Sequence, residues 1–97
     1  MPDEAVVRND SEHRFELHVD GKVAFLNYRQ RPQEIIMVHT EVPPELEGHG
    51  IGGKLARAAL DYARQQNLKV AAPCPFVAAY IQRHPEYSDL LRRDKSD

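Results

Sequence analysis

The densest group of residues with a possible chemical role is a glycine cluster near the middle of the chain. Four of the five glycines lie within the segment Gly48-His49-Gly50-Ile51-Gly52-Gly53. A helix is predicted directly after it, and the first N–H groups of a helix have no acceptor within the helix and lie at the positive end of its dipole. Glycine also lets an anion approach the backbone without a Cβ in the way. The segment therefore predicts an anion-binding loop suited to a phosphate.

Two familiar phosphate-binding motifs match the sequence of this loop but not the structural context or the metal ligand that each motif requires. The glycines satisfy G-x-G-x-x-G, but that motif must directly follow a strand of a parallel sheet, and here residues 43–47 intervene. The loop also matches the P-loop pattern, except that Leu55 replaces the Ser or Thr that holds magnesium. We therefore expect neither a dinucleotide-binding domain nor a P-loop nucleotide site.

Three side chains outside the loop could take part in chemistry. Cys74, the single cysteine, precedes Pro75 and is predicted at a helix N-terminus, where the dipole favours a thiolate. The alternative for Cys74 is a small buried hydrophobic side chain. His39 and Glu41 are two positions apart in a predicted strand, so they share one face. Either could act as a general base, directly or through water, or His39 could be a sheet-face histidine bonded to a neighbour.

Three strands joined by short turns are predicted before the glycine loop. Residues 13–19 alternate apolar and polar side chains, as a half-buried strand does, and Asp20-Gly21 after them is a hairpin signal. Residues 23–28 are predicted as a second, more central strand and residues 35–42 as a third. Pro43-Pro44 ends the third strand, because proline cannot donate to a sheet ladder. These elements form an antiparallel meander.

A helix, a strand and a second helix are predicted after the loop. Apolar residues at helical spacing extend from Ile51 to Tyr62, with Asn67 as the C-cap. Residues 68–72 form a fourth strand, parallel and adjacent or nearly so to the third. A second helix follows Cys74 and stops at Pro85, and one or two helical turns come after it.

The predicted fold class is α+β, an antiparallel three-stranded meander followed by α-β-α. A chain of 97 residues is one domain, here residues 1–97 with loose ends at 1–10 and 92–97. The 13 basic and 15 acidic residues form no basic stripe, so nucleic-acid binding is not expected. No apolar run approaches the ~20 residues that span a bilayer, and no signal peptide is visible, so we expect a cytoplasmic protein. One cysteine excludes a disulfide within the chain and a Cys-based zinc site, and no metal is predicted.

The segment from about His39 to Leu90 resembles the small, truncated subfamily of the Gcn5-related N-acetyltransferases. The glycine loop resembles motif A of that family, Gln/Arg-x-x-Gly-x-Gly/Ala followed by a helix. Glu47 departs from this pattern, and a carboxylate there implies weaker coenzyme binding unless it points away or pairs with Lys54 or Arg57. The residues that carry the resemblance are His39-Thr40-Glu41-Val42-Pro43, Gly48-His49-Gly50-Ile51-Gly52, Cys74-Pro75-Phe76-Val77 and His84-Pro85-Glu86-Tyr87.

The resemblance implies an acetyl-CoA-dependent N-acetyltransferase with a central mixed sheet flanked by helices. Its amine acceptor would be a small molecule, or a lysine or N-terminus of a protein, attacking the thioester directly. A backbone N–H near Val42 would polarise the thioester carbonyl. Coenzyme A would be held by the loop through backbone N–H groups. The implied cofactor-binding residues are Val42, Gly48, His49, Gly50, Ile51, Gly52, Gly53 and Lys54.

The implied catalytic residues are Cys74, His39, Glu41 and Tyr80. Cys74 could be an acyl-accepting nucleophile, a proton donor to the departing thiolate or a determinant of acceptor shape. Tyr80 resembles the tyrosine that protonates the leaving thiolate in larger family members, although core packing also explains it. The family's N-terminal helices have no counterpart, since Asp20-Gly21 joins strand to strand. The alternative function is a non-catalytic acyl-CoA-binding or sensor module.

Overall fold

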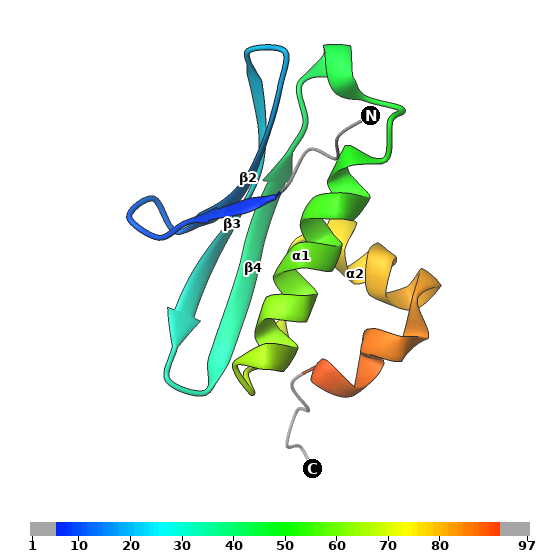
Figure 1. Cartoon of the computed structure of the whole chain (residues 1–97). Helices are drawn as coiled ribbons and strands as arrows, with labels where there is room; N and C mark the ends of the chain where they lie inside the picture. The colour runs from blue at the N-terminus through cyan, green and yellow to red at the C-terminus, as the bar shows by residue number, and fades with distance from the viewer. Residues whose placement is uncertain (1–5, 92–97) are drawn as a thin grey trace.

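The computed structural model describes residues 6–91, which form a five-stranded sheet with helices packed on one face (Figure 1). The strands lie side by side in chain order, β1-β2-β3-β4-β5. Neighbouring strands are antiparallel except β4 and β5, which are parallel. The bounds are β1 Val7–Asn9, β2 Arg14–Val19, β3 Lys22–Arg31, β4 Glu34–Glu41, η1 Pro44–Leu46, α1 Ile51–Gln65, β5 Lys69–Ala71, α2 Pro75–Arg83 and η2 Pro85–Leu90, where η1 and η2 are 3₁₀ helices.

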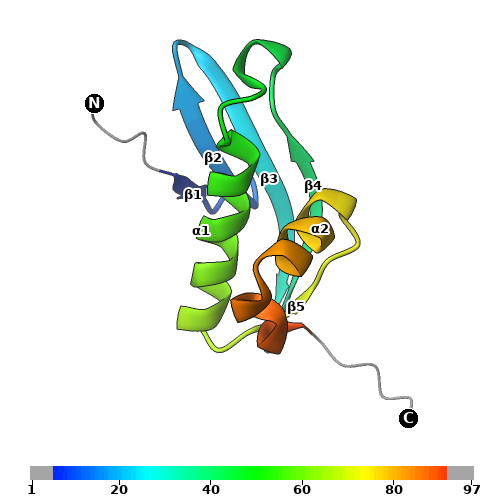
Figure 2. The same ribbon diagram turned by 90° about the vertical axis from the view of Figure 1, so that its right-hand side faces the viewer.

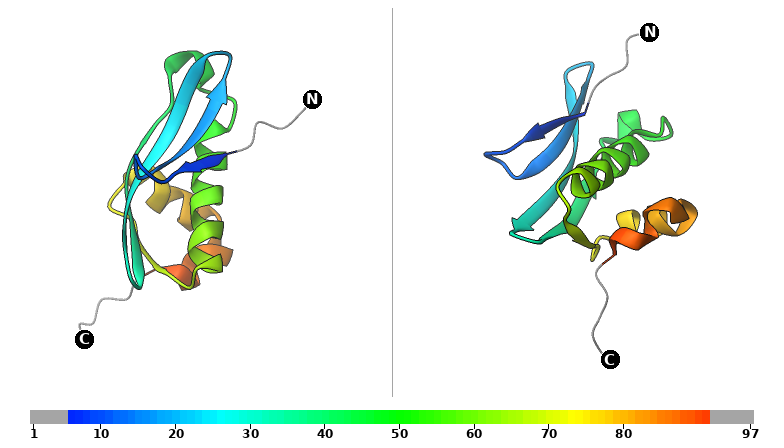
Figure 3. Two further views of the ribbon diagram at one scale, coloured as in Figure 1. Left: turned by 60° about the vertical axis from the view of Figure 1, so that its left-hand side comes forward. Right: turned by 60° about the horizontal axis from the view of Figure 1, so that its bottom comes forward.

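The helices α1 and α2 cover the same face of the sheet, and within residues 6–91 no helix covers the other face (Figures 2 and 3). We call these the helix face and the uncovered face. The core lies between the sheet and the helices, where Leu17, Leu26 and Met37 from the sheet meet Leu55 and Leu60 of α1. No helix among the described residues is long and apolar enough to span a membrane.

The α+β fold class and the parallel pairing of the third and fourth predicted strands are confirmed. The prediction of a loose segment over residues 1–10 is wrong where the structure describes it, because Val7–Asn9 form β1 and pair with β2. This strand is short and polar, so it gives no alternation signal. A contact with a residue distant in sequence helps to hold β1 in place: the Arg8 guanidinium lies 4.7 Å from the centre of the Tyr62 ring on α1. The predicted loose ends at 1–5 and 92–97 lie outside the described residues.

A β-bulge interrupts β4 at Val38. Met37 pairs with Tyr28 of β3, but His39 pairs with Asn27, so Val38 is an extra residue without a partner. The bulge shifts the alternation of side chains by one position. Met37 therefore lies on the helix face and is fully buried, while His39 lies on the uncovered face and is exposed.

The helix α1 begins and ends with left-handed residues. Its N-cap is Gly50, at φ 73°, and Asn67, at φ 58°, lies just beyond its C-cap Gln66. The N–H of Leu68 donates to the Ala63 carbonyl at 2.8 Å, and the N–H of Asn67 donates to that of Arg64 at 3.2 Å. These two bonds are those of a Schellman motif. Asn67 was predicted to end this helix, and it does so as the left-handed residue after the cap.

The apolar faces of the two helices differ slightly from the sequence prediction. The buried stripe of α1 includes Leu60, whereas Tyr62 is only half-buried. In α2, Val77, Tyr80 and Ile81 are buried as predicted, but Phe76 is 37% exposed. Phe76 lies in the first turn of α2, beside the N-terminus of α1, and its position matters for the site described next.

Candidate functional site

A cavity of about 550 Å³ opens on the helix face between the glycine loop, the end of β4 and α2. We call it the glycine-loop cleft. Its size is within the range of small-molecule and cofactor sites. Its lining residues are Thr40, Val42, Leu46, Glu47, Gly48, Gly50, Ile51, Gly52, Gly53, Phe76, Tyr80, Arg83 and His84.

The glycine loop presents free backbone donors to this cleft. Gly48 and Gly50 have φ of 87° and 73°, a backbone conformation that residues other than glycine rarely adopt. The first N–H used inside α1 is that of Lys54, which donates to the Gly50 carbonyl at 3.1 Å. The N–H groups of Gly52 and Gly53 precede it and have no acceptor within the helix. An anion in the cleft would therefore meet unpaired donors and the positive end of the α1 dipole.

The side chains of His49 and Lys54 do not line this cleft. Both border a separate cavity of about 380 Å³ on the other side of the loop, together with Val19, Asp20 and Glu45. Glu47 does line the glycine-loop cleft and is exposed. The structure thus brings most of the predicted cofactor-binding residues together but places these two around a second opening.

Close packing between the helices explains the glycine at position 52. A Cβ on Gly52 would lie 2.7 Å from Cζ of Phe76, and a Cβ on Gly53 would lie 3.6 Å from Cε1 of Tyr80. The first turn of α1 therefore approaches α2 too closely for a side chain at Gly52 without movement of the Phe76 ring. Phe76 forms a wall of the cleft at this point.

Cys74 lies where β4 and β5 separate. The two strands pair only from Glu34 to Ile36 on the β4 side, after which β4 continues beside β3 without β5. Cys74 is the N-cap of α2, as predicted, and is 4% exposed. Its N–H donates to the Met37 carbonyl at 3.3 Å, and its Sγ lies 3.6 Å from Oγ1 of Thr40. Thr40 lines the cleft, whereas Cys74 does not line it and lies directly behind Thr40.

Tyr80 lines the cleft with a buried ring that is stacked on His84, with centroids 4.1 Å apart. Burial raises the pKa of the Tyr80 phenol above its ordinary value. The phenol therefore stays protonated at neutral pH and can donate a hydrogen bond or a proton. Arg83 and His84, which also line the cleft, were not predicted as site residues. They follow Tyr80 by three and four residues, a spacing that places them on the same side of the helix as Tyr80 and could have indicated that they line the cleft.

His39 and Glu41 share one face of β4, as predicted, but it is the uncovered face. His39 Nε2 lies 3.2 Å from Oε1 of Glu41, and both side chains are exposed. Because of the bulge at Val38, this pair is separated by the sheet from Cys74 and Tyr80. The four predicted catalytic residues therefore form two groups, one on each side of β4.

Beside this pair, the uncovered face carries a buried carboxylate, that of Glu16 on β2. Arg14 Nε donates to Glu16 Oε2 at 2.6 Å, Asn9 Nδ2 donates to the same oxygen at 2.9 Å, and His18 Nε2 lies 3.0 Å from Oε1. These bonds, the one from Arg14 first, lower the pKa of Glu16 from 4.5 to about 2. The Arg14 guanidinium also lies 4.6 Å from the ring centre of Phe25. This network gives the uncovered face a polar, ordered surface.

A family model described as GCN5-related N-acetyl-transferase matches residues 14–90. The chain belongs to this family. Mouse protein NATD1 is 34% identical to it over 92 residues, covering 89% of this chain and 84% of that protein. Chicken protein NATD1 is 34% identical over 83 residues, covering 81% and 76%.

The fold has a close counterpart among solved structures of the family. The solution NMR structure of a GCN5-like protein from Staphylococcus aureus, described as a candidate N-acetyltransferase, has a TM-score of 0.74 and 30% sequence identity. The match covers 99% of this chain and 95% of that one. The resemblance stated from the sequence is thereby confirmed for the family and the fold, while the individual site residues stay predictions.

Proposed function

We propose that this protein is an acetyl-CoA-dependent N-acetyltransferase that binds coenzyme A in the glycine-loop cleft. The observation that carries the proposal is the set of unpaired N–H groups at the α1 N-terminus, which open into a cleft of about 550 Å³. Family membership supports the reaction type. The amine acceptor is a small molecule or a group on a protein.

The residues of the cleft fit the chemical parts of coenzyme A. The amides of Gly52 and Gly53 suit the pyrophosphate, and Val42, Leu46 and Phe76 supply apolar walls for a flexible chain. Arg83 adds a positive charge, and the Glu47 carboxylate opposes it. Binding therefore relies on backbone donors more than on side-chain charge.

When bound, acetyl-CoA supplies the thioester whose acetyl group is transferred to the amine. Tyr80 and Cys74 lie on the helix-face side of β4, and the Tyr80 O–H and the Cys74 S–H are the available donors for the sulfur that departs as the C–S bond breaks. The raised pKa of Tyr80 keeps its proton in place until then. Thr40 bonds to the Cys74 sulfur and holds it beside the cleft.

On the other side of β4, His39 takes the proton that the amine loses as the C–N bond forms. With its Nε2–H donated to Glu41, the imidazole keeps a lone pair on Nδ1 for this purpose. The acceptor would therefore approach from the uncovered face. This division places the base and the acid on opposite sides of one strand.

Calorimetric titration of acetyl-CoA tests the binding site, with Gly50→Ala and Gly21→Ala as matched variants. Both glycines have similar positive φ values, 73° and 78°, and at neither does an added Cβ meet an atom within 4 Å. Both variants should lose similar stability, about 1 kcal/mol. Only Gly50→Ala should weaken acetyl-CoA binding, by about tenfold. Equal affinities in the two variants would contradict the proposed site.

Turnover separates an enzyme from a module that only binds the coenzyme. Release of free thiol from acetyl-CoA should be followed with a panel of amines, for wild type, Cys74→Ala and His39→Ala. We expect acetyl transfer that falls about a hundredfold or more in the His39 variant. Binding of acetyl-CoA without transfer to any amine would favour the sensor module, and unchanged rates in both variants would refute the assignment of these residues.

A further inference from the structure

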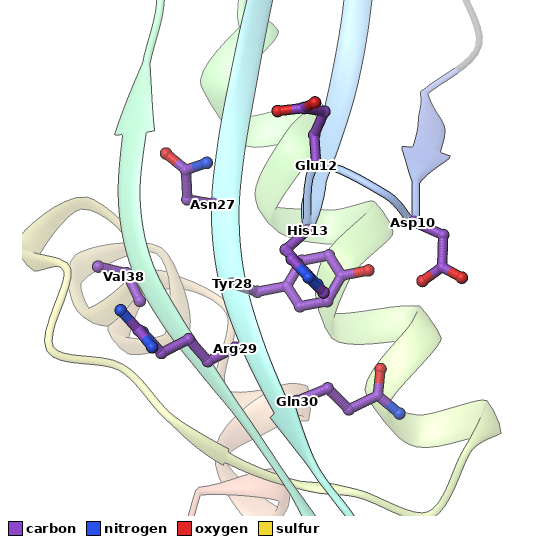
Figure 4. A pocket seen from close by; sticks show the side chains of 8 residues that line it. All are labelled: Asp10, Glu12, His13, Asn27, Tyr28, Arg29, Gln30 and Val38. Atoms are coloured by element: carbon purple, nitrogen blue, oxygen red, sulfur yellow. The ribbon is translucent and has the colours of Figure 1, made fainter.

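A second cavity, of about 610 Å³, lies against β3 and β4 and under the turn between β1 and β2 (Figure 4). We call it the outer groove. Figure 4 shows the helices behind the sheet, so the groove opens on the side away from the glycine-loop cleft. Its lining residues are Asp10, Glu12, His13, Asn27, Tyr28, Arg29, Gln30 and Val38.

The groove adjoins the proposed reaction centre through the β4 bulge. Val38, the extra residue of the bulge, lines the groove, and the preceding Met37 carbonyl accepts the N–H of Cys74. Asn27, also in the groove, is the cross-strand partner of His39. An amine placed beside Val38 would therefore lie next to His39.

One wall of the groove consists of hydrogen-bond donors. Within residues 6–91, neither the Arg29 guanidinium nor the Asn27 carboxamide has a hydrogen-bond or ion-pair partner. Both lie on the uncovered face, on the same strand and two positions apart. A guanidinium suits a carboxylate, which takes two parallel N–H bonds from arginine, and the Asn27 carboxamide on the same face offers a further donor.

The opposite wall is acidic. Glu12 comes from the β1–β2 turn, and its carboxylate has no partner among the described residues. Asp10 is paired with Arg8 at 2.8 Å. The turn is fixed to β3, since the Tyr28 N–H donates to the His13 carbonyl at 2.9 Å, and His13 has a left-handed φ of 56°. A second carboxylate on a ligand would meet repulsion from this wall.

We propose that the outer groove is the acceptor site and that it selects an α-amino acid with a neutral or basic side chain. The carboxylate of the acceptor binds Arg29 and Asn27, which places its amine beside Val38 and His39. Glu12 disfavours acidic side chains. The inference rests on the proposed function, because it names the acceptor of that reaction.

NMR of the full chain tests binding without turnover. L-Alanine should shift the side-chain N–H signals of Arg29 and Asn27, and ethylamine, which lacks the carboxylate, should not. Arg29→Gln should abolish the shift at Asn27. Arg31→Gln is the matched control, since Arg31 lies on the same strand but does not line the groove. Absence of these shifts, or equal effects of the two variants, would overturn the inference.

Kinetics tests the acceptor role. Arg29→Gln should raise KM for L-alanine about tenfold or more and leave KM for ethylamine and the affinity for acetyl-CoA unchanged. L-Glutamate should be a poorer acceptor than L-alanine, and Glu12→Gln should narrow that gap. A chain that binds acetyl-CoA and acetylates amines without preference for a carboxylate would keep the proposed function and lose this inference. A chain that does not bind acetyl-CoA would lose both.

Discussion

Protonation of Glu16 should destabilise the fold, because this buried carboxylate accepts hydrogen bonds from Arg14 and Asn9 and contacts His18. A carboxyl group whose pKa falls from 4.5 to about 2 on folding contributes roughly 3 kcal/mol to stability at neutral pH, at about 1.4 kcal/mol per pH unit. Arg14 and His18 are partly exposed, at 29% and 58% of their side chains, so solvent screening lowers the expected value to about 1–3 kcal/mol.

The sign of the pH dependence follows from the lowered pKa. The contribution of Glu16 is fully present above pH 4.5, the ordinary value, and is lost as the pH falls towards about 2. Below that pH the folded and unfolded states both carry the protonated acid. The free energy of unfolding should therefore fall across this window by more than the other carboxylates account for.

Urea unfolding of wild type and Glu16→Gln at several pH values between 7 and 2 measures this term. The amide keeps the size of the side chain but carries no charge, so the other acids cancel in the difference between the two proteins. We expect a difference of about 1–3 kcal/mol at pH 7 that shrinks steadily below pH 4.5. A difference that does not change with pH would refute the reasoning.

Urea unfolding of substituted variants tests three further local features of the fold. Tyr87→Phe removes a 2.8 Å hydrogen bond to Asp61 and should lower the free energy of unfolding by about 1–2 kcal/mol. Burial raises the pKa of Tyr87 to about 12, so the greater stability of wild type over Tyr87→Phe should be lost as the pH rises from 10 to 12. Asn67→Ala should cost about 1 kcal/mol and Asn67→Gly should not, because φ is 58° there. Gly52→Ala should stabilise a Phe76→Ala variant by about 1 kcal/mol, through helix propensity, and should gain less in wild type, where the ring must move. The opposite order in the last pair would mean that the contact with Phe76 has no energetic effect.

The sequence was sufficient for the parts of the fold that local chemistry decides. Asp20-Gly21 forms the β2–β3 turn, and the glycine segment leads into α1 as predicted, with Gly48 and Gly50 before the helix and Gly52 and Gly53 in its first turn. The parallel crossover from β4 to β5 followed from handedness and chain length. The turn and glycine-loop signals lie within a few residues of one another, and the crossover follows from a general rule of handedness, so none of them needed tertiary information.

The parts that were missed depend on contacts between distant residues. The strand β1 exists because it pairs with β2 and because Arg8 packs on Tyr62, and neither contact has a local signature. The lining of the cleft by Arg83 depends on the angle at which α2 meets α1. The separation of His39 from Cys74 depends on the bulge at Val38. No residue type in this run of strand-forming residues indicates where a bulge occurs.

The bulge also makes the faces of β4 depend on one unpaired residue. Deletion of Val38 would remove the bulge but leave His39 directly after Met37, so simple alternation would keep His39 and Glu41 on the uncovered face and Thr40 on the helix face. Pairing of Val38 with β3 would instead slip the register by one position, so His39 and Glu41 would follow Met37 onto the buried side and Thr40 would turn outward. For relatives of this chain, a gap of one position in an alignment at Val38 therefore preserves the two faces of the strand, whereas loss of the bulge without a gap exchanges them.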